Sequence, residues 1–448
     1  MGDRVDVEQH RADVAELLAP LADRPTEEVS LHQDVLGRVL ARDVAAPAAL
    51  PRFRNSQMDG FAVRAADVAP AAPGAPVTLP VAGDVAAAPG EPAPLEPGTA
   101  VRIMTGAPVP EGADAVVPVE DTDHGTFNGA AGVPAATVAV ARARAAGEFV
   151  REPGSDVAAG AVVLRAGTVL APHHVAAAAA CGITRLPVLV PVSVAVVSTG
   201  SELVPPDGEP GPGQVWDANG PALEAAVRAA GGRVGLRVSV PDEPEIVRVA
   251  LERAAALCDL VLTTGGVSQG AYEVVKDALP EVTFRSVAMQ PGGPQGLGRV
   301  GGRPVLAFPG NPVSAQVSFV VFLRDLLRRA GGLPPVERVP AVLDGAVGSP
   351  AGRRQLLRGR WVRDAGAAGG APGDGATVSD AAVAGAAVVD GGLAGAAVAA
   401  DGGPRRVAVV GGPGSHLVAS MAAADVLIDV PADTTTLDPG ARVTVWPL

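Results

Sequence analysis

The pattern of apolar residues predicts alternating strands and helices in the second half of the chain. Unbroken apolar runs, typical of buried strands, alternate there with segments whose apolar residues recur every three or four positions, as in helices. Such alternation indicates a mainly parallel sheet between two layers of helices, in which ligands bind at the carboxyl ends of the strands. The predicted strands cover residues 192–197, 233–240, 260–264 and 305–309, and the predicted helices cover 221–230, 244–257 and 313–330.

The rest of the chain predicts further domains, which makes this an α/β multidomain protein. Helical spacing at residues 5–18 begins an N-terminal helical and linker domain, and short strands with Gly/Pro turns predict a β-rich insertion domain within it. A small β-barrel-like domain is expected at the C-terminal end, interrupted by an Ala/Gly-rich stretch, 364–404, that reads as a loose loop. The predicted boundaries are 1–46 with 149–190 for the N-terminal domain, 47–148 for the insertion, 191–332 for the three-layer αβα domain and 336–448 for the C-terminal domain.

Composition narrows the classes of function. The net charge of −13 argues against nucleic acid as a partner, because phosphate backbones require a basic face. Cys181 and Cys258 each lie in an apolar run, which predicts buried thiols rather than a disulfide. The first 20 residues are charged and lack a signal-peptide core, and the aliphatic run 186–197 is too short to span a bilayer. We therefore expect a cytoplasmic protein.

Three junctions between a predicted strand and the following turn are rich in small and polar residues. They begin at Thr199, Thr263 and Pro309. Glycines in such turns let backbone N–H groups approach a phosphate or another oxyanion. The P-loop and dinucleotide glycine motifs do not occur. The candidate substrate-binding residues in these junctions are Thr199, Gly200, Gly265, Gly266, Ser268, Pro309, Gly310, Asn311 and Pro312.

Several carboxylates follow the same predicted strand ends and are candidate ligands of Mg²⁺, which prefers carboxylate oxygens together with ligand phosphates. These are Glu202, Asp242, Glu273 and Asp277. Glu202 directly follows a strand end and is the strongest metal candidate, whereas Asp277 is better explained as an ordinary surface acid on an acidic protein.

Seven strings of residues together resemble one known family. They are NSQMDGFAVR (55–64), RIMTGAPVPEGADAVV (102–117), STGSEL (198–203), TTGGVS (263–268), FPGNPVSA (308–315), GRRQLLRGR (352–360) and GPGSHLVASMAAAD (412–425). In this order they are similar to the molybdopterin molybdenumtransferase family, called MoeA in bacteria and found as the E domain of gephyrin. The resemblance runs from about residue 30 to the end of the chain, and in this family the αβα domain is MogA-like.

The resemblance implies an elongated homodimer whose active site lies between the αβα domain of one subunit and the insertion domain of the other. Adenylyl-molybdopterin, molybdate and Mg²⁺ would enter, and molybdenum cofactor and AMP would leave. A MogA-type adenylyltransferase is then an expected partner. Residues at family motif positions are Asp59, Thr105, Glu202 and Asp242 as catalytic residues, Asp59 and Glu202 also as metal ligands, and Asp156, Pro309, Pro312 and Ser415 as substrate-binding residues. Glu273 is a metal candidate as one of the carboxylates that follow the strand ends.

The chain departs from the family pattern at two expected lysines and in one acidic string. A family segment that commonly reads KPGKP is QPGGP at residues 290–294, so Gln290 and Gly293 replace two lysines. The family's GDYD is GAYE at residues 270–273. Lys276, the only lysine in the chain, is therefore the cation that we expect to bind the anionic substrate.

Two other functions compete with an active transferase. A gephyrin-like scaffold that binds a membrane-protein tail, with weakened or lost catalysis, is favoured by the lysine losses. A generic nucleotide-dependent enzyme with a MogA-like sheet is disfavoured, because the strings of the insertion domain match the family too.

Overall fold

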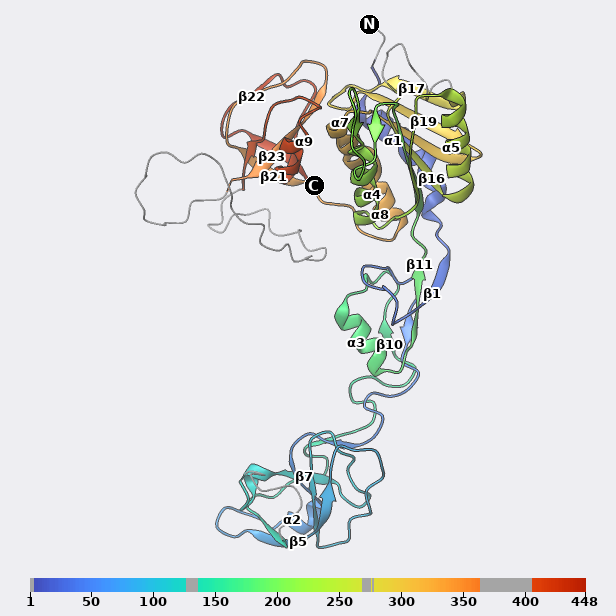
Figure 1. Ribbon diagram of the computed structural model, residues 1–448. Coiled ribbons are helices and arrows are strands. Elements are labelled where there is room, and N and C mark those ends of the chain that lie inside the picture. The colour runs from blue at the N-terminus through green and yellow to red at the C-terminus, as the bar shows by residue number, and fades with distance from the viewer. Residues whose placement is uncertain (1–3, 126–135, 268–274, 276–277, 363–404) are drawn as a thin grey trace. The chain divides into compact units, whose positions relative to one another are not determined.

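The computed structural model describes residues 4–125, 136–267, 275, 278–362 and 405–448. Three expected site residues, Ser268, Glu273 and Lys276, and the Ala/Gly-rich stretch lie outside the described residues. The chain divides into two compact units (Figure 1). The larger unit comprises residues 1–26 and 189–448, and the smaller unit comprises residues 27–188.

The larger unit is built on a six-stranded sheet with the strand order β15-β12-β16-β20-β19-β17. The first four strands run parallel, as the sequence predicts, whereas β19 and β17 join the edge as antiparallel strands. Sequence analysis missed β19 because Gly296 and Gly298 interrupt its apolar pattern. The strands span β12 (Ser193–Thr199), β15 (Arg233–Val240), β16 (Leu260–Thr264), β17 (Val282–Ser286), β19 (Pro294–Val300) and β20 (Arg303–Phe308).

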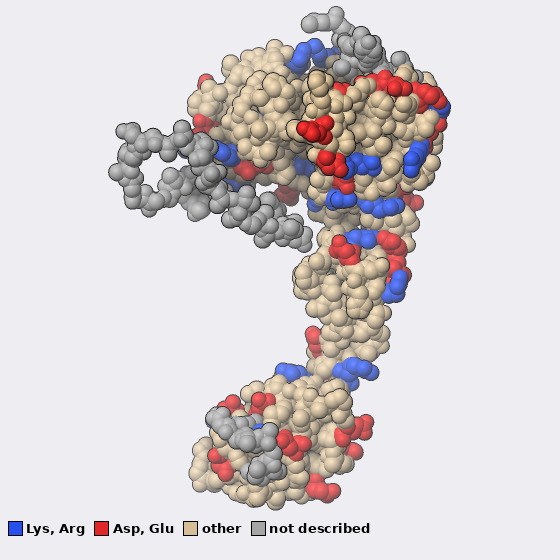
Figure 2. All heavy atoms as spheres, viewed as in Figure 1, with Lys and Arg blue, Asp and Glu red and all other residues tan. Residues whose placement is uncertain are grey.

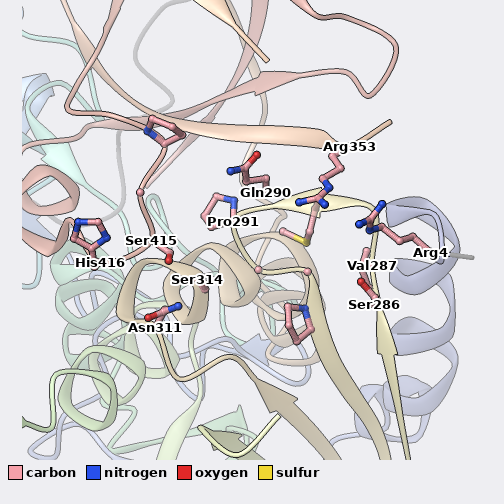
Figure 3. Close-up of a pocket in the computed structure, with 16 residues that line it drawn as sticks. Arg4, Ser286, Val287, Gln290, Pro291, Asn311, Ser314, Arg353, Ser415 and His416 are labelled. Atoms are coloured by element: carbon pink, nitrogen blue, oxygen red, sulfur yellow. The ribbon is translucent and has the colours of Figure 1, made fainter. Parts of the chain in front are cut away.

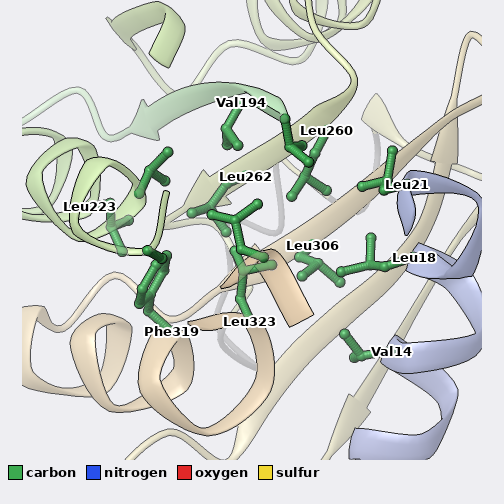
Figure 4. Packing of buried hydrophobic residues seen from close by; sticks show 14 of the residues in the cluster. Val14, Leu18, Leu21, Val194, Leu223, Leu260, Leu262, Leu306, Phe319 and Leu323 are labelled. Atoms are coloured by element: carbon green, nitrogen blue, oxygen red, sulfur yellow. The ribbon is translucent and has the colours of Figure 1, made fainter. Parts of the chain in front are cut away.

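The central strands are apolar on both faces, which places a layer of helices on each side. Val194 and Leu262 point into one core, and their neighbours Ala195 and Val261 point into the other. Helices α1 and α4 cover the first core, shown in Figure 4, and α5 covers the second. The expected three-layer αβα fold is confirmed. These helices span α1 (Val7–Leu18), with a 3₁₀ turn at Ala19–Ala22, α4 (Asn219–Ala229) and α5 (Pro244–Leu257).

The last helix of this domain is not the single regular helix that the sequence predicts. It consists of α7 (Pro312–Ser318), a π-helical segment (Phe319–Leu323) and α8 (Arg324–Ala330). All five residues of the π-helical segment are buried. Phe319 and Leu323 pack against the sheet, whereas the residues between them pack in the core that adjoins the C-terminal domain. Five consecutive buried residues exceed one face of an α-helix, and the wider π turn distributes them between the two cores.

The C-terminal domain is a closed barrel of five strands. Its strand order is β23-β24-β21-β27-β25, and β25 pairs back with β23 to close the ring, which confirms the expected barrel-like domain. The short strand β18 (Met289–Gln290) of the αβα domain pairs with β23 and connects the two domains. The barrel elements span β21 (Val339–Leu343), β22 (Val347–Gly348), β23 (Arg354–Trp361), β24 (Arg406–Val409), α9 (Val418–Ala422), β25 (Val426–Val430), β26 (Thr436–Leu437) and β27 (Arg442–Pro447).

The smaller unit contains the β-rich insertion and the linker elements. Its five-stranded sheet has the order β7-β4-β6-β5-β8 and buries apolar cores on both faces. The sheet elements span β4 (Gly60–Val63), α2 (Ala65–Val68), β5 (Val77–Val85), β6 (Ala100–Ile103), β7 (Ala115–Pro118), a 3₁₀ turn (Val119–Asp121) and β8 (Thr137–Val140). The linker elements are β1 (Thr26–Ser30), β2 (Val44–Ala45), β3 (Asn55–Ser56), β9 (Val150–Arg151), β10 (Val162–Leu164), α3 (Pro172–Ala180) and β11 (Arg185–Leu189).

Two further observations bear on the sequence expectations. Cys181 and Cys258 are both free and buried, which confirms the expected buried thiols. Among the described residues, no helix is both long enough and apolar enough to cross a membrane. On the face of the larger unit seen in Figure 2, basic side chains occur in small groups among acidic ones.

We predict that His10 makes the larger unit sensitive to acid. Its ring is buried against Phe322 at 4.6 Å between ring centroids, and burial lowers its pKa from 6.5 to about 4. The unfolded chain takes up a proton near pH 6.5, whereas the folded chain does so only near pH 4, so stability present above pH 6.5 falls as the pH drops toward 4. The loss should be about 3 kcal/mol.

Urea unfolding followed by tryptophan fluorescence measures this loss, since Trp216, Trp361 and Trp446 all lie in the larger unit. His10→Leu should flatten the dependence of the unfolding free energy on pH between these values. The matched control is His32→Leu, at an exposed histidine of the smaller unit, which should leave the dependence unchanged. An undiminished dependence in His10→Leu would contradict the prediction.

Candidate active site

The carboxyl ends of β12, β16 and β20 meet at one edge of the sheet, and the turns that follow them line a cavity of about 510 Å³. The structure therefore brings together most of the site residues expected in this domain. Gly200 lines an adjoining cavity, with Ser201 and Leu203. The expected residues that line the 510 Å³ cavity are Thr199, Glu202, Asp242, Gly265, Gly266, Pro309, Gly310, Asn311 and Pro312.

Glycines let these turns approach one another. Gly265 has a φ of +99°, which side chains other than glycine rarely adopt, and a Cβ atom there would lie 2.3 Å from the carbonyl oxygen of Thr199. A Cβ atom on Gly310 would lie 3.3 Å from the Cα atom of Gly265. The backbones of neighbouring turns are thus in direct contact, which leaves their polar groups at the cavity wall.

A buried hydrogen-bond network fixes the turns. The Asn219 side-chain amide donates to Thr264 Oγ1 at 2.9 Å and to the carbonyl oxygen of Gly310 at 2.7 Å. Thr264 Oγ1 in turn donates to the carbonyl oxygen of Pro309 at 3.0 Å. Asn219 Oδ1 is buried without a hydrogen-bond partner among the described residues, so it can still accept a hydrogen bond. The network connects the start of α4 to two of the three junctions.

Three carboxylates line the cavity, and they differ in what their oxygens bind. Asp217 is buried; its Oδ1 accepts hydrogen bonds from the N–H groups of Asn219 and Gly220, and its Oδ2 accepts one from Ser239. Asp242 exchanges hydrogen bonds with Ser201. Sequence analysis missed Asp217, although an acid two residues before a helix start is a recognisable capping signal.

Glu202 differs because its carboxylate accepts no hydrogen bond from the described residues and it is exposed at the cavity. Among the described residues no three His, Cys, Asp or Glu side chains lie close enough together to hold a metal by themselves. Mg²⁺ commonly keeps several waters and binds one or two carboxylates together with substrate phosphates. Glu202, with Asp242 beside it, is thus the carboxylate best placed to contact a metal that arrives with a phosphate.

A second cavity, of about 460 Å³, lies between the αβα domain and the barrel (Figure 3). It shares Asn311, Ser314 and Pro294 with the first, so the two adjoin. Its lining includes Arg4, Ser286, Gln290, Arg353, Ser415 and His416, and none of its described lining residues is acidic.

The basic character of this second cavity is notable in a chain with a net charge of −13. Neither Arg4 nor Arg353 forms an ion pair with a described residue, and Figure 3 shows their side chains near each other at one end of the cavity. The Ser415 carbonyl oxygen accepts a hydrogen bond from the N–H of Val313 at 3.3 Å, which holds the barrel loop at the start of α7. Sequence analysis assigned no role to either arginine. Arg353 lies within a quoted motif, but nothing in the sequence singles out Arg4.

In the smaller unit, Asp59 and Thr105 form a pair. The backbone N–H and the hydroxyl of Thr105 donate to Asp59 Oδ1 at 2.6 and 2.8 Å. The backbone hydrogen bond, then the hydroxyl and the charge of Arg102, lower the pKa of Asp59. Asp156 is exposed, and its backbone N–H donates to the carbonyl oxygen of Leu50. The expected positions of Asp59 and Glu202 across a dimer stay a prediction.

Comparisons with known proteins match both units. The MoeA N-terminal region (domain I and II) matches residues 5–182, a probable molybdopterin binding domain matches residues 195–329, and the MoeA C-terminal region (domain IV) matches residues 395–448.

Individual relatives agree with these matches. The chain is 42% identical over 453 residues to molybdopterin molybdenumtransferase 2 of Mycobacterium tuberculosis, with 99% of each chain covered. It is 38% identical over 331 residues to molybdopterin molybdenumtransferase of Synechococcus elongatus, with 69% of this chain and 77% of the relative covered. The crystal structure of the molybdopterin biosynthesis MoeA protein from Pyrococcus horikoshii superimposes with a TM-score of 0.74 at 28% identity, with 99% of each chain covered.

We predict that Thr105→Val raises the pKa of Asp59 toward its usual value of 3.8 without reaching it. The variant removes the hydroxyl donor and keeps the backbone N–H, so part of the stabilisation of the carboxylate remains. A ¹³C carboxyl titration of the aspartate-labelled full chain measures the pKa, with Asp59 assigned by its absence in Asp59→Asn. Thr78→Val, at an exposed threonine of β5, is the control. An unchanged Asp59 titration in Thr105→Val would refute the assignment of the hydrogen bond.

Proposed function

We propose that this chain, which belongs to the molybdopterin molybdenumtransferase family, inserts molybdate into adenylyl-molybdopterin and releases AMP. The chain is an enzyme of molybdenum cofactor biosynthesis, of the transferase class. The substrate would be supplied by an adenylylating enzyme of the MogA type, and the reaction would use Mg²⁺.

The observation that carries this proposal is that two cavities adjoin, one lined by carboxylates and glycine-rich turns and the other by basic side chains. The first contains glycine-rich turns and the free carboxylate of Glu202, which suit a phosphate bridged to a metal ion. The second contains Arg4, Arg353 and His416 without an acid among its described lining residues, which suits an oxyanion such as molybdate. Because Asn311 and Ser314 line both, an anion in the second cavity would lie beside a phosphate in the first.

Each set of residues would have a distinct part in the reaction. The turns would hold the phosphate of the adenylylated substrate through their backbone N–H groups, and Asn219 would keep two of these turns in place through its hydrogen bonds to Thr264 and Gly310. Mg²⁺, when bound, neutralises charge that develops on the phosphate and leaving oxygens. Glu202 would hold the metal, and Asp242 would support it. The arginines would position molybdate next to the dithiolene sulfurs.

The proposal includes a homodimer. Asp59, with a pKa that Thr105 holds low, would be an ionised carboxylate at neutral pH, suited to contact a metal or a cation. By family resemblance it would reach the αβα domain of a second copy and complete the site there.

A scaffold without catalysis is the competing function, and the second cavity argues against it. The two family lysines are replaced by Gln290 and Gly293, yet both positions line a cavity in which Arg4 and Arg353 supply positive charge. A chain that had lost the reaction would have no need of unpaired arginines at this place.

We predict that Glu202→Gln lowers the rate of AMP release by about 100-fold, since a metal ligand contributes several kcal/mol to charge stabilisation. The side chain keeps its size, so the fold should persist. Single-turnover assays with adenylyl-molybdopterin, molybdate and Mg²⁺ measure the rate. Glu209→Gln, at an exposed acid of the 205–214 loop, is the matched control and should react like the wild type. A wild-type rate in Glu202→Gln would remove Glu202 from the site, and no AMP release from the wild type would favour the scaffold.

We also predict that Arg4 replaces the missing lysines in binding molybdate. Arg4→Ala should weaken binding of molybdate alone by roughly tenfold, about the effect of one charge-assisted hydrogen bond. Adding Gln290→Lys to this variant, which restores a family lysine in the same cavity, should recover part of the affinity. Calorimetry at fixed ionic strength measures both, with Arg253→Ala, an exposed arginine of α5, as the charge-matched control. Equal affinity in Arg4→Ala and the wild type, or no gain from the added lysine, would contradict this role.

A further inference from the structure

Trp216 is an exposed aromatic side chain at the wall of the first cavity, in a chain that has few aromatic residues. The chain contains 3 tryptophans, 1 tyrosine and 8 phenylalanines. Trp446 is 1% exposed, whereas Trp216 is 56% exposed and lines the cavity next to Asp217. Exposing an indole ring forgoes the large gain from its burial, so a ring left open beside a ligand cavity calls for an explanation.

The ring of Trp216 is held in place from several directions. Its indole N–H donates to the carbonyl oxygen of Gly208 at 2.8 Å. Its strand β14 (Val215–Trp216) pairs with β13 (Leu203–Val204), which directly follows the junction that carries Glu202. The next residue, Asp217, is buried and caps α4 through Asn219 and Gly220. Little conformational freedom therefore remains to be lost when a ligand binds the ring.

The faces of this ring also differ from those of the other tryptophans. An arginine guanidinium lies over Trp361 at 3.8 Å from the ring centroid, and another lies over Trp446 at the same distance. No described arginine or lysine lies over Trp216 in this way. With its only polar atom already hydrogen-bonded, Trp216 offers a flat apolar surface and no further donor.

We propose that Trp216 is a stacking platform for a planar heteroaromatic ring of the substrate. This rests on the proposed function, whose substrate carries two such rings, the adenine and the pterin. A flat indole beside turns that suit a phosphate would bind the ring by stacking while the turns bind the phosphate. Trp216 would thus determine specificity for a substrate with an aromatic base, and it would take no part in the transfer of molybdenum.

Equilibrium binding to the full chain tests this role with three probes: AMP, neopterin and ribose 5-phosphate. Trp216→Ala should weaken the binding of AMP or neopterin by roughly tenfold, the effect usual for loss of one stacked base. Trp216→Phe should keep most of the affinity. Ribose 5-phosphate, which has no base, should bind all variants equally. The stacked ring is the adenine if AMP is affected, and the pterin if neopterin is affected.

Fluorescence provides a second measurement. The stacked probe should quench tryptophan emission in the wild type and in the control Trp361→Phe, and the quenching should be absent in Trp216→Phe. Equal binding of both AMP and neopterin by the wild type and Trp216→Ala overturns the proposal. The proposal is also overturned if the wild type binds neither AMP nor neopterin, or if Trp216→Ala loses ribose 5-phosphate binding in parallel. A change of oligomeric state in Trp216→Ala without a change in affinity overturns it as well. These two experiments measure binding and not AMP release, so their failure can be told apart from a failure of the proposed reaction.

Discussion

Arg354 of the barrel joins the barrel to the αβα domain, because it pairs with Asp429 of the barrel and with Glu8 on α1. Arg354 donates to both oxygens of the Asp429 carboxylate, from Nε at 2.7 Å and from one terminal nitrogen, and its other terminal nitrogen donates to Glu8 on α1. The Trp446 indole donates to the same Asp429 carboxylate at 3.0 Å. The hydrogen bond to Asp429 raises the pKa of Arg354, and loss of Arg354 would leave the buried Asp429 carboxylate without its cation.

The second cavity lies next to this arrangement. Arg353 precedes Arg354 at the start of β23, and Gln290 lies in the strand that pairs with β23. Ser415 and His416 come from the barrel, whereas Arg4 and Ser286 come from the αβα domain. The cavity walls thus belong to segments far apart in the sequence, and the Arg354–Glu8 ion pair and the pairing of β18 with β23 join the two domains that supply them. Binding of an anion in this cavity therefore depends on the docking of the barrel against the αβα domain.

Periodicity was sufficient to predict the part of the site that follows from the parallel sheet. Alternation of apolar residues identified β12, β16 and β20, and a parallel sheet places their carboxyl ends at one edge, so the turns after Thr199, Thr264 and Phe308 had to converge. Periodicity could not identify the residues that reach the site only through tertiary contacts. Arg4 belongs to no motif, and the hydrogen bond that Ser239 donates to Asp217 joins residues 22 positions apart in the chain.

The contact between Gly265 and Gly310 has a consequence for how the sequence of this site can change over generations. The two glycines belong to different junctions: a Cβ atom on Gly265 would collide with the carbonyl oxygen of Thr199, and a Cβ atom on Gly310 would press on the Cα atom of Gly265. The backbone of Thr199 therefore decides what is tolerated at Gly265, and the backbone of Gly265 decides what is tolerated at Gly310. The three junctions form one epistatic group, whose members diverge together or remain fixed.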